Sequence, residues 1–402
     1  MRNHTRAFLF LICALVLPAV AQRRAPKDLS GVRGFNYEPA EVMGQLWLQY
    51  DPAVTERDFD YAKRLQLNQA RVFVPYDVWQ KDREALRKNL LHLVRAAHER
   101  GIGVMPTLQY KSDEWRDEAA WPNSRVFVAD LVATLGKESG LEIWDVENEP
   151  ECCTLPPTTD DRLHMKHAMY MAKVFHELDP VTPVTIGAAL AENMIEMGDA
   201  VDVLSFHDYS PTRDQIRSTI QKAQQYAAKT GKPLVVTEIG CVARANPYDI
   251  ALQEHMRARV GWYIWELMIA DYWGSVHGVF YPDGTVRDPS IAAALLGFFR
   301  NRGTKTVEEV PDRENHLTEA VAKNKRWLSD PNPDWQAGLD LAEVSANLLE
   351  SAQLVPMRTL PTREVELLRA GQPDIPSLRL LLEKLTSSLE PYQLPPNDPR
   401  RS

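Results

Sequence analysis

Residues 141–150 read Leu-Glu-Ile-Trp-Asp-Val-Glu-Asn-Glu-Pro, a largely apolar stretch that turns acidic and polar and stops at a proline. Residues 232–240, Lys-Pro-Leu-Val-Val-Thr-Glu-Ile-Gly, follow the same plan: an apolar run reaches a carboxylate, and a glycine follows. Proline donates no hydrogen bond to a sheet, so Pro150 marks the end of a strand. Both stretches predict a buried strand that ends in polar side chains, Asn148 and Glu149 in the first and Glu238 in the second.

Six further apolar segments resemble these two strands and alternate with longer segments of helical spacing. Their nearly continuous apolar character is typical of parallel strands that are covered on both faces. The predicted strands are residues 32–37, 69–73, 103–107, 141–146, 184–187, 203–206, 234–237 and 261–265.

The segments between the strands carry helix signals of their own. Apolar residues at steps of four, three and four residues align on one helical face. The clearest set is Leu86, Leu90, Leu93 and Ala97. Asp288-Pro289 predicts an N-cap and a first helical position, with a helix running to about residue 302. The fifth unit is short, so its helix is expected at about residues 191–197.

Eight strands alternating with helices predict either a doubly wound sheet or a closed (β/α)₈ barrel. No glycine-rich phosphate loop follows the first strand, which disfavours a dinucleotide-binding sheet. The units average roughly 34 residues, which suits a barrel of about 250 residues. The sequence therefore predicts a (β/α)₈ TIM barrel over residues 28–303. Glu149 and Glu238 would then lie on strands four and seven, at the face where the carboxyl ends of the strands meet.

The residues before and after this region differ from it in composition. Residues 1–21 begin with Arg2 and Arg6, continue with an apolar run and end in Ala-Val-Ala, which predicts a signal peptide and a secreted or periplasmic protein. Residues 304–402 are rich in proline, with short helical patterns at 339–354 and 375–389. They predict a helical, partly irregular C-terminal extension, which could instead pack on the barrel as a cover.

The composition of the chain excludes some kinds of binding partner. The 402 residues carry a formal net charge of −9, which argues against a nucleic-acid partner, and no apolar run is long enough for membrane insertion. The 10 Trp and 13 Tyr residues offer flat faces that suit sugar rings. After the signal peptide only Cys152, Cys153 and Cys241 remain, either reduced or with Cys241 paired to one of the other two. No Cys/His spacing resembles a zinc site, and no metal or cofactor is expected.

Two carboxylates that face each other match the needs of glycoside hydrolysis. The transition state resembles an oxocarbenium ion, so one group must protonate the leaving oxygen. The other must attack the anomeric carbon or activate water. The first must hold a proton and the second must be charged, so their surroundings must differ.

These motifs resemble those of clan A retaining glycoside hydrolases, and in particular glycoside hydrolase family 5 or a close relative. Residues 144–150 resemble the Asn-Glu-Pro signature, and residues 236–240 resemble the strand that carries the nucleophile. The resemblance extends over four further places: Arg33–Asn36, Arg71, residues 206–209 and Trp265. Family 5 enzymes usually carry a histidine near the end of strand three, where this chain has Gln109 and Tyr110.

The resemblance implies a role for each site residue. Glu149 would be the general acid and then the general base, and Glu238 the nucleophile. Arg71 would favour the charged form of Glu238, whereas the more sheltered Glu149 could hold a proton. Asn148 would hydrogen-bond the sugar 2-hydroxyl, and Arg71 and Tyr209 would hydrogen-bond the nucleophile. His207 would line the site, and the sugar ring would stack on Trp265.

The sequence thus predicts a secreted retaining β-glycoside hydrolase, an endo-β-glycanase or a β-glycosidase, acting on a β-linked glycan. A non-catalytic glycan-binding protein and a transglycosylase on the same barrel stay as alternatives. Asp145 and Glu147 alternate with Glu149, so by strand periodicity they are expected on its face, one of them as a supporting partner. For Glu266, beside Trp265, a solvated position is the simplest interpretation.

Overall fold

The computed structural model describes residues 28–42, 44–110, 112–151, 155–241, 246–270, 277–300, 307–309, 312–351 and 361–393. The predicted signal peptide and Cys152 and Cys153 lie outside these ranges. Cys241 is described, and it is a buried free thiol.

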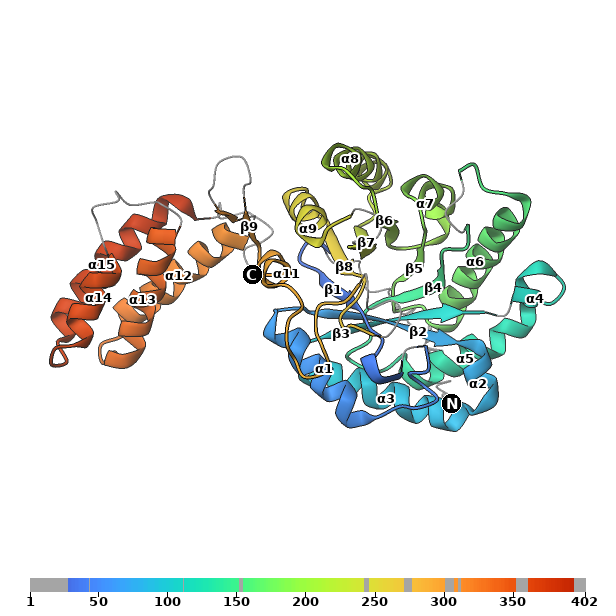
Figure 1. Ribbon diagram of the computed structural model, residues 1–402, viewed down its shortest axis with the longest axis horizontal. Coiled ribbons are helices and arrows are strands. Elements are labelled where there is room, and N and C mark those ends of the chain that lie inside the picture. Colours follow the sequence, from blue (N-terminus) through green and yellow to red (C-terminus); the bar gives the residue numbers. More distant parts are fainter. Residues whose placement is uncertain are drawn as a thin grey trace, which may run out of the picture.

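Eight parallel strands form a nearly closed barrel, which confirms the predicted (β/α)₈ architecture (Figure 1). Their order in the sheet is β5-β4-β3-β2-β1-β8-β7-β6. An isolated bridge between Ala188 and Phe206 links the two end strands, and the His207 amide donates to the Ala188 carbonyl at 2.8 Å. The strands are β1 (Arg33–Asn36), β2 (Gln69–Pro75), β3 (Gly103–Gln109), β4 (Trp144–Asn148), β5 (Val184–Gly187), β6 (Leu204–Asp208), β7 (Leu234–Ile239) and β8 (Gly261–Ile264).

Helices surround the barrel and bury the faces that the sequence predicts. In α3 the side chains of Leu86, Leu90 and Leu93 are buried, and Asp82 caps the helix by accepting from the Ala85 amide at 2.9 Å. The described helices of the barrel are α1 (Pro52–Arg64), α2 (Tyr76–Lys81), α3 (Arg83–Glu99), α4 (Ser112–Arg116), α5 (Trp121–Leu135), α6 (Thr159–Leu178), α7 (Ala191–Met197), α8 (Arg213–Thr230), α9 (Tyr248–Arg257) and α11 (Pro289–Leu295), with 3₁₀ turns at Ala40–Val42 and Gly198–Ala200. Helix α7 has the bounds expected for the short fifth unit.

The last barrel helix begins as predicted but ends early. Asp288 accepts from the Ser290 amide at 2.8 Å and Pro289 occupies the first turn of α11. The helix stops at Leu295 rather than near residue 302, because Gly297 adopts φ 89° and turns the chain out of the helix. Strand β9 (Phe298–Arg300) follows and pairs antiparallel with β10 (Val307–Glu309).

The barrel interior divides into an apolar and a polar end. Near the amino ends of the strands a small apolar cluster fills the interior, made of Leu29, Val32, Met105, Ile143, Val203, Val235 and Tyr263. Nearer the carboxyl ends the buried interior side chains are polar, and Arg71, Asp145 and Glu238 lie there. The fold therefore gathers buried charge at the face predicted for the site.

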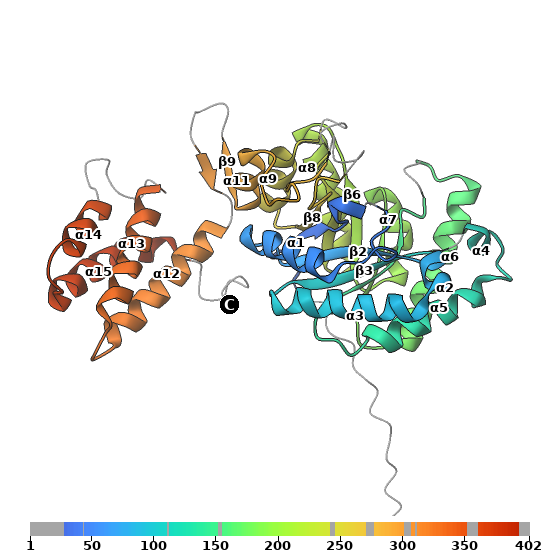
Figure 2. The same cartoon turned by 60° about the horizontal axis from the view of Figure 1, so that its bottom comes forward.

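Four helices follow the barrel and lie to one side of it in both views (Figures 1 and 2). They bury their apolar faces in a cluster of their own that includes Leu317, Leu339 and Leu378. The helices are α12 (Asp312–Ser329), α13 (Trp335–Ser351), α14 (Pro361–Arg369) and α15 (Ile375–Leu389), with a 3₁₀ turn at Glu390–Tyr392. Helix α15 has the predicted bounds, and α13 begins four residues before the predicted 339.

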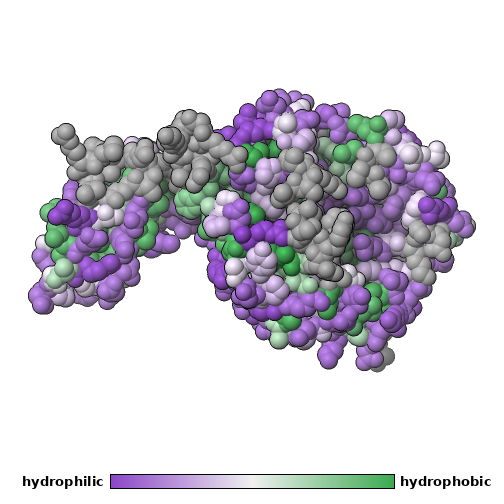
Figure 3. All heavy atoms as spheres, viewed as in Figure 1, coloured by the Kyte–Doolittle hydropathy of each residue, from purple (hydrophilic) through white to green (hydrophobic). Residues whose placement is uncertain are grey.

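Hydrophilic residues cover most of the visible surface of both the barrel and the C-terminal helices (Figure 3). Among the described helices, none has both the length and the apolar character needed to cross a membrane.

Candidate active site

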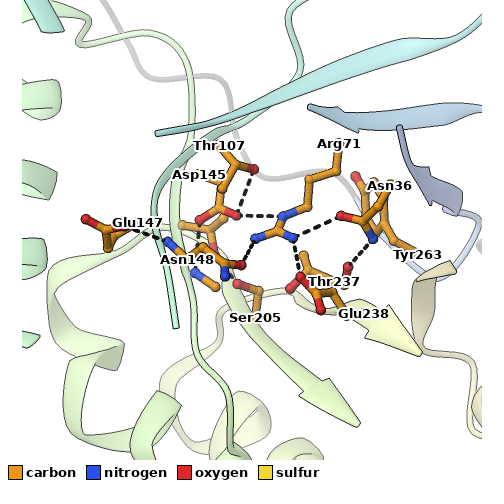
Figure 4. A network of polar contacts seen from close by, with 12 residues as sticks. Asn36, Arg71, Thr107, Asp145, Glu147, Asn148, Ser205, Thr237, Glu238 and Tyr263 are labelled. Atoms are coloured by element: carbon orange, nitrogen blue, oxygen red, sulfur yellow. Dashed lines mark hydrogen bonds and ion pairs between the residues drawn. The ribbon is translucent and has the colours of Figure 1, made fainter. Parts of the chain in front are cut away.

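Arg71, on β2, is fully buried and stands at the centre of a network of polar contacts (Figure 4). Its guanidinium donates to Asp145 Oδ2 at 2.8 Å, Asn36 Oδ1 at 2.9 Å, Glu238 Oε1 at 2.7 Å and Asn148 Oδ1 at 2.6 Å. Charge-assisted hydrogen bonds of this kind are stronger and more directional than neutral ones. One cation therefore fixes the relative positions of side chains from β1, β4 and β7.

The register of the barrel explains how these groups meet. Asn36 and Arg71 are partners across β1 and β2, and the Asn36 amide also donates to the Thr237 and Ile264 carbonyls at 2.9 and 3.1 Å. On β5, a Cβ atom added to Gly187 would lie 2.9 Å from Arg71 Nη2 and 3.1 Å from Asp145 Oδ2. Glycine at this position leaves the space that the ion pair fills.

Glu149 and Glu238 lie on either side of His207. One oxygen of each glutamate and one ring nitrogen of His207 all lie within 4.8 Å of one another. His207 Nδ1 is 2.6 Å from Glu149 Oε1 and 3.5 Å from Glu238 Oε2, and the Tyr209 hydroxyl donates to Glu238 Oε2 at 2.8 Å. The two carboxylates are thus neighbours, although 89 residues separate them in the chain (149 to 238). The same three ligating atoms could also hold a cation.

The charge on His207 depends on these two neighbours. Burial lowers its pKa, but the carboxylates of Glu238 and Glu149 outweigh burial and raise the pKa above its ordinary value. Nδ1 is the ring nitrogen that faces both carboxylates. The site therefore places a titratable ring nitrogen between Glu149 and Glu238.

Irregular backbone aims the site residues. The register shifts between Asp145 and Asn148 on β4, between Phe206 and His207 on β6, and between Val236 and Ile239 on β7. Such bulges re-aim side chains beside active sites. Directly after β4, Glu149 adopts φ 46°, a conformation of order 1–3 kcal/mol above the usual ones for a residue with a Cβ atom.

One expectation about the two glutamates is wrong. Glu149 was expected to be the more sheltered, but its side chain is 23% exposed against 7% for Glu238. Glu149 lies beyond the end of β4, whereas Glu238 lies within β7 and points into the barrel. The difference between them comes from their partners, because Arg71 and Tyr209 both donate to Glu238.

Trp265 directly follows β8 at the same end of the barrel. Its amide donates to the Ile239 carbonyl at 2.8 Å, and its partly exposed ring meets Phe73 edge-on at a centroid distance of 5.8 Å. The peptide bond between Trp265 and Glu266 is cis. Trp265 therefore keeps exposed surface at the end of the barrel where Glu238 lies.

Two further expectations about neighbouring acids are wrong. The side chain of Glu147 points away from Arg71 (Figure 4), because the bulge on β4 breaks the strand alternation, although its Oε1 accepts from the Asn148 amide at 3.1 Å. Asp145 binds Arg71, which confirms that one of the two acids is a supporting partner. Glu266 is not solvated: it is 1% exposed, and burial, together with Glu38 and Glu238, raises its pKa to about 8.

The third strand supplies Thr107 to this network, and the Thr107 hydroxyl donates to Asp145 Oδ2 at 3.1 Å (Figure 4). Gln109 is exposed at the end of β3, and Tyr110 packs edge-on against Phe127 and His167. Sequence reasoning also gave no separate role to Asn36, although it lies at the end of the quoted Arg33–Asn36 motif. Its position as the last residue of a strand was the signal that could have identified it.

The protein belongs to the class of (β/α)₈ barrels, and it carries two carboxylates and an arginine at the carboxyl ends of its strands. Comparison with solved structures identifies proteins of similar fold. The chain resembles a substituted glycoside hydrolase of family 5, subfamily 18, from Streptomyces cattleya in complex with Manβ1-4GlcNAc, with TM-score 0.56 and 18% identity over 70% of this chain and 83% of that one.

Two other similar structures come from different enzymes. An exo-β-1,4-mannosidase from Opitutaceae bacterium strain TAV5 has TM-score 0.53 and 16% identity over 79% of this chain and 75% of that one. A family 5 lichenase from Caldicellulosiruptor sp. F32 has TM-score 0.53 and 14% identity over 69% of this chain and 97% of that one. No family model and no curated protein matches the chain. The similarity to family 5 structures is therefore one of fold, and it agrees with the predicted barrel.

Proposed function

We propose that this protein is a retaining β-glycoside hydrolase that works by double displacement. The observation that carries the proposal is the spacing of Glu149 and Glu238, which bring one oxygen each to within 4.8 Å. Retaining enzymes hold their carboxyl groups about 5–5.5 Å apart, whereas inverting enzymes leave roughly 6.5–9.5 Å for a water molecule. The short spacing supports direct attack on the sugar by one of the two groups.

The partners of each carboxylate support the assignment of roles. Glu238 accepts hydrogen bonds from Arg71 and Tyr209, which stabilise its charged form and orient it as the nucleophile. Glu149 is more exposed and contacts His207, so it is placed to give a proton to the leaving oxygen and later to take one from water. No step of this mechanism requires a cofactor.

Three other groups would bind the sugar. Asn148, held by Arg71, would hydrogen-bond the 2-hydroxyl, a contact that strengthens in the transition state. Trp265 would stack under the ring, and His207 would line the site. The substrate would be a β-linked glycan, and β-mannosides are the first to test because two of the similar structures are described with such a ligand or activity.

The activity is tested with aryl β-glycosides and with oligosaccharides of β-linked mannose, glucose and xylose. The expected result is hydrolysis of at least one β-linked substrate, with the β-anomer as first product by NMR. Glu238→Ala should lose this activity and regain turnover with azide, giving a glycosyl azide of inverted configuration. Glu177→Gln, an exposed acid on α6, is the matched control.

The alternatives predict different outcomes. A glycan-binding protein would bind an oligosaccharide without releasing reducing ends, and a transglycosylase would give mainly transfer products at high acceptor concentration. The proposal would be falsified if a substrate cleaved by the parent chain were cleaved equally well by Glu149→Ala and Glu238→Ala.

Secretion is part of the same proposal, on the basis of the basic and apolar residues 1–21. Expression of the full chain in a bacterial host should release a mature protein that begins at Gln22. Recovery of the protein only inside the cell with its N-terminus intact would contradict it.

A further inference from the structure

A second cluster of polar side chains lies on the far side of β4 from the Arg71 network. Glu147 at the end of β4 faces His164 and His167, one turn apart on α6. One oxygen of the glutamate and one nitrogen of each histidine all lie within 4.8 Å of one another. None of the three belongs to the proposed catalytic machinery.

Unsatisfied polar atoms are concentrated at this place. In the described ranges of the chain, 13 buried side-chain atoms have no hydrogen-bond partner. Five of them are here: Tyr110 Oη, Glu147 Oε2, His164 Nε2 and both ring nitrogens of His167. Each unsatisfied buried group costs roughly 1–3 kcal/mol. The glutamate oxygen and one nitrogen of each histidine can offer lone pairs to a common partner.

The geometry of the cluster suits a small cation. Glu147 Oε2 and His164 Nε2 are 3.2 Å apart without being aligned for a hydrogen bond. Two ligands at zinc bond lengths near 2.0 Å in a tetrahedral site are roughly 3.3 Å apart. His167 is fully buried, and neither of its ring nitrogens has a hydrogen-bond partner among the described residues, so one of them can bind a metal.

Aromatic rings enclose the cluster and fix its histidines. Trp115 stacks on His164 with ring centroids 4.5 Å apart, and Tyr110 and Trp121 meet His167 edge-on at 5.0 and 5.5 Å. Two imidazoles and one carboxylate favour zinc and similar transition metals over calcium or magnesium, which prefer oxygen ligands.

We propose that Glu147, His164 and His167 bind one divalent transition-metal ion of the zinc class. The ion would join α6 to the end of β4, directly before Asn148 and Glu149. It would stabilise the fold and would take no part in the chemistry, so the proposal stands independently of the proposed function.

The test uses the full chain, first treated with a chelator and then dialysed against zinc, cobalt or calcium. Expected results are one zinc per chain by elemental analysis, a visible spectrum of tetrahedral cobalt, a higher unfolding temperature with zinc, and no effect of calcium. The proposal is overturned if the parent chain binds no zinc at micromolar concentration. In that case water molecules supply the missing hydrogen bonds of the cluster.

Variants identify the ligands. His167→Ala and Glu147→Gln should each weaken zinc binding at least about 100-fold, with Glu147→Gln as the variant that preserves shape if His167→Ala does not fold. His176→Ala, a partly exposed histidine on the same helix, should bind as the parent does. Glu149→Gln should also bind as the parent does. Loss of zinc in Glu149→Gln with full binding in His167→Ala would place the ion at the catalytic cluster and refute the proposal.

Discussion

His207 Nδ1 lies 2.6 Å from Oε1 of Glu149, and the same nitrogen lies 3.5 Å from Glu238. A single imidazole nitrogen therefore contacts both carboxylates across which the sugar would be cleaved. When groups interact this closely, their titrations belong to the cluster rather than to either residue. In the proposed mechanism, the proton needed for the first step would be shared between His207 and Glu149.

We expect this sharing to set the alkaline limb of the activity profile. The pKa of His207 is raised by its two carboxylate neighbours, so the pair should lose its proton only above the ordinary imidazole range. In His207→Asn the imidazole is gone and only the carboxyl of Glu149 can hold the proton. The alkaline limb of the pH profile of kcat/KM should therefore move to lower pH. His176→Asn is the control, and an unchanged profile in His207→Asn would show that the histidine does not share the proton.

The role of Glu149 is tested by the leaving group. In Glu149→Gln, kcat/KM should fall by about 10²–10⁴ for an alkyl leaving group, which needs protonation. For a dinitrophenyl leaving group, which needs little protonation, the fall should be much smaller. Glu177→Gln should show neither effect. Equal losses for both leaving groups would contradict the assignment of Glu149 as the acid.

Asp145 should be essential for stability rather than for chemistry. It accepts from Arg71 Nε at 2.8 Å and from the Gly187 amide at 2.9 Å, and both charges are fully buried. Breaking a buried ion pair costs about 3–5 kcal/mol, so Asp145→Asn should lower the free energy of unfolding by about that amount in a denaturant titration. Asp160→Asn, an exposed acid on α6, should change it little. A stable Asp145→Asn protein would mean that Glu238 and Asn148 suffice to hold Arg71.

Gly187 should tolerate no side chain. A methyl group there would lie 2.9 Å from Arg71 Nη2, so Gly187→Ala should displace the guanidinium and cost about 1–3 kcal/mol of stability through overpacking. Activity should fall even where the variant stays folded, because Arg71 orients Glu238. Gly31→Ala is the control, since nothing lies within 4 Å of its added Cβ. Full activity in Gly187→Ala would show that Arg71 has room to move.

Glu266 should make the folded protein less stable at alkaline pH. Its folded pKa of about 8 lies above the value near 4.3 expected for the unfolded chain, so the folded state binds the extra proton. Stability should therefore decrease as the pH rises from about 4.3 to about 8. Glu266→Gln, which resembles the protonated form, should unfold at higher temperature than the parent at pH 8–9.

The two proteins should unfold alike near pH 4, where Glu266 is protonated in the parent. Glu99→Gln, an exposed acid at the end of α3, should give no pH-dependent difference. Identical unfolding temperatures for Glu266→Gln and the parent across the whole pH range would mean that Glu266 is solvated after all.

The sequence by itself determined the barrel and the ends of the strands that carry its polar groups. Eight apolar segments alternate with segments of helical spacing, and this periodicity is a local property of each segment. It can therefore be recognised in the sequence without knowing how the segments pack. Asn148, Glu149 and Glu238 could be selected for the same reason. Each follows an apolar run, and parallel strands of a barrel all end at one face.

Only the tertiary structure decided which acids support the site. Periodicity predicts a face only while a strand is regular, and the bulge after Asp145 sends Glu147 toward α6 instead of toward Arg71. Burial of Glu266 and the cluster around His167 depend on segments far apart in the chain. Contacts of this kind arise from packing, and no local pattern of residues encodes them.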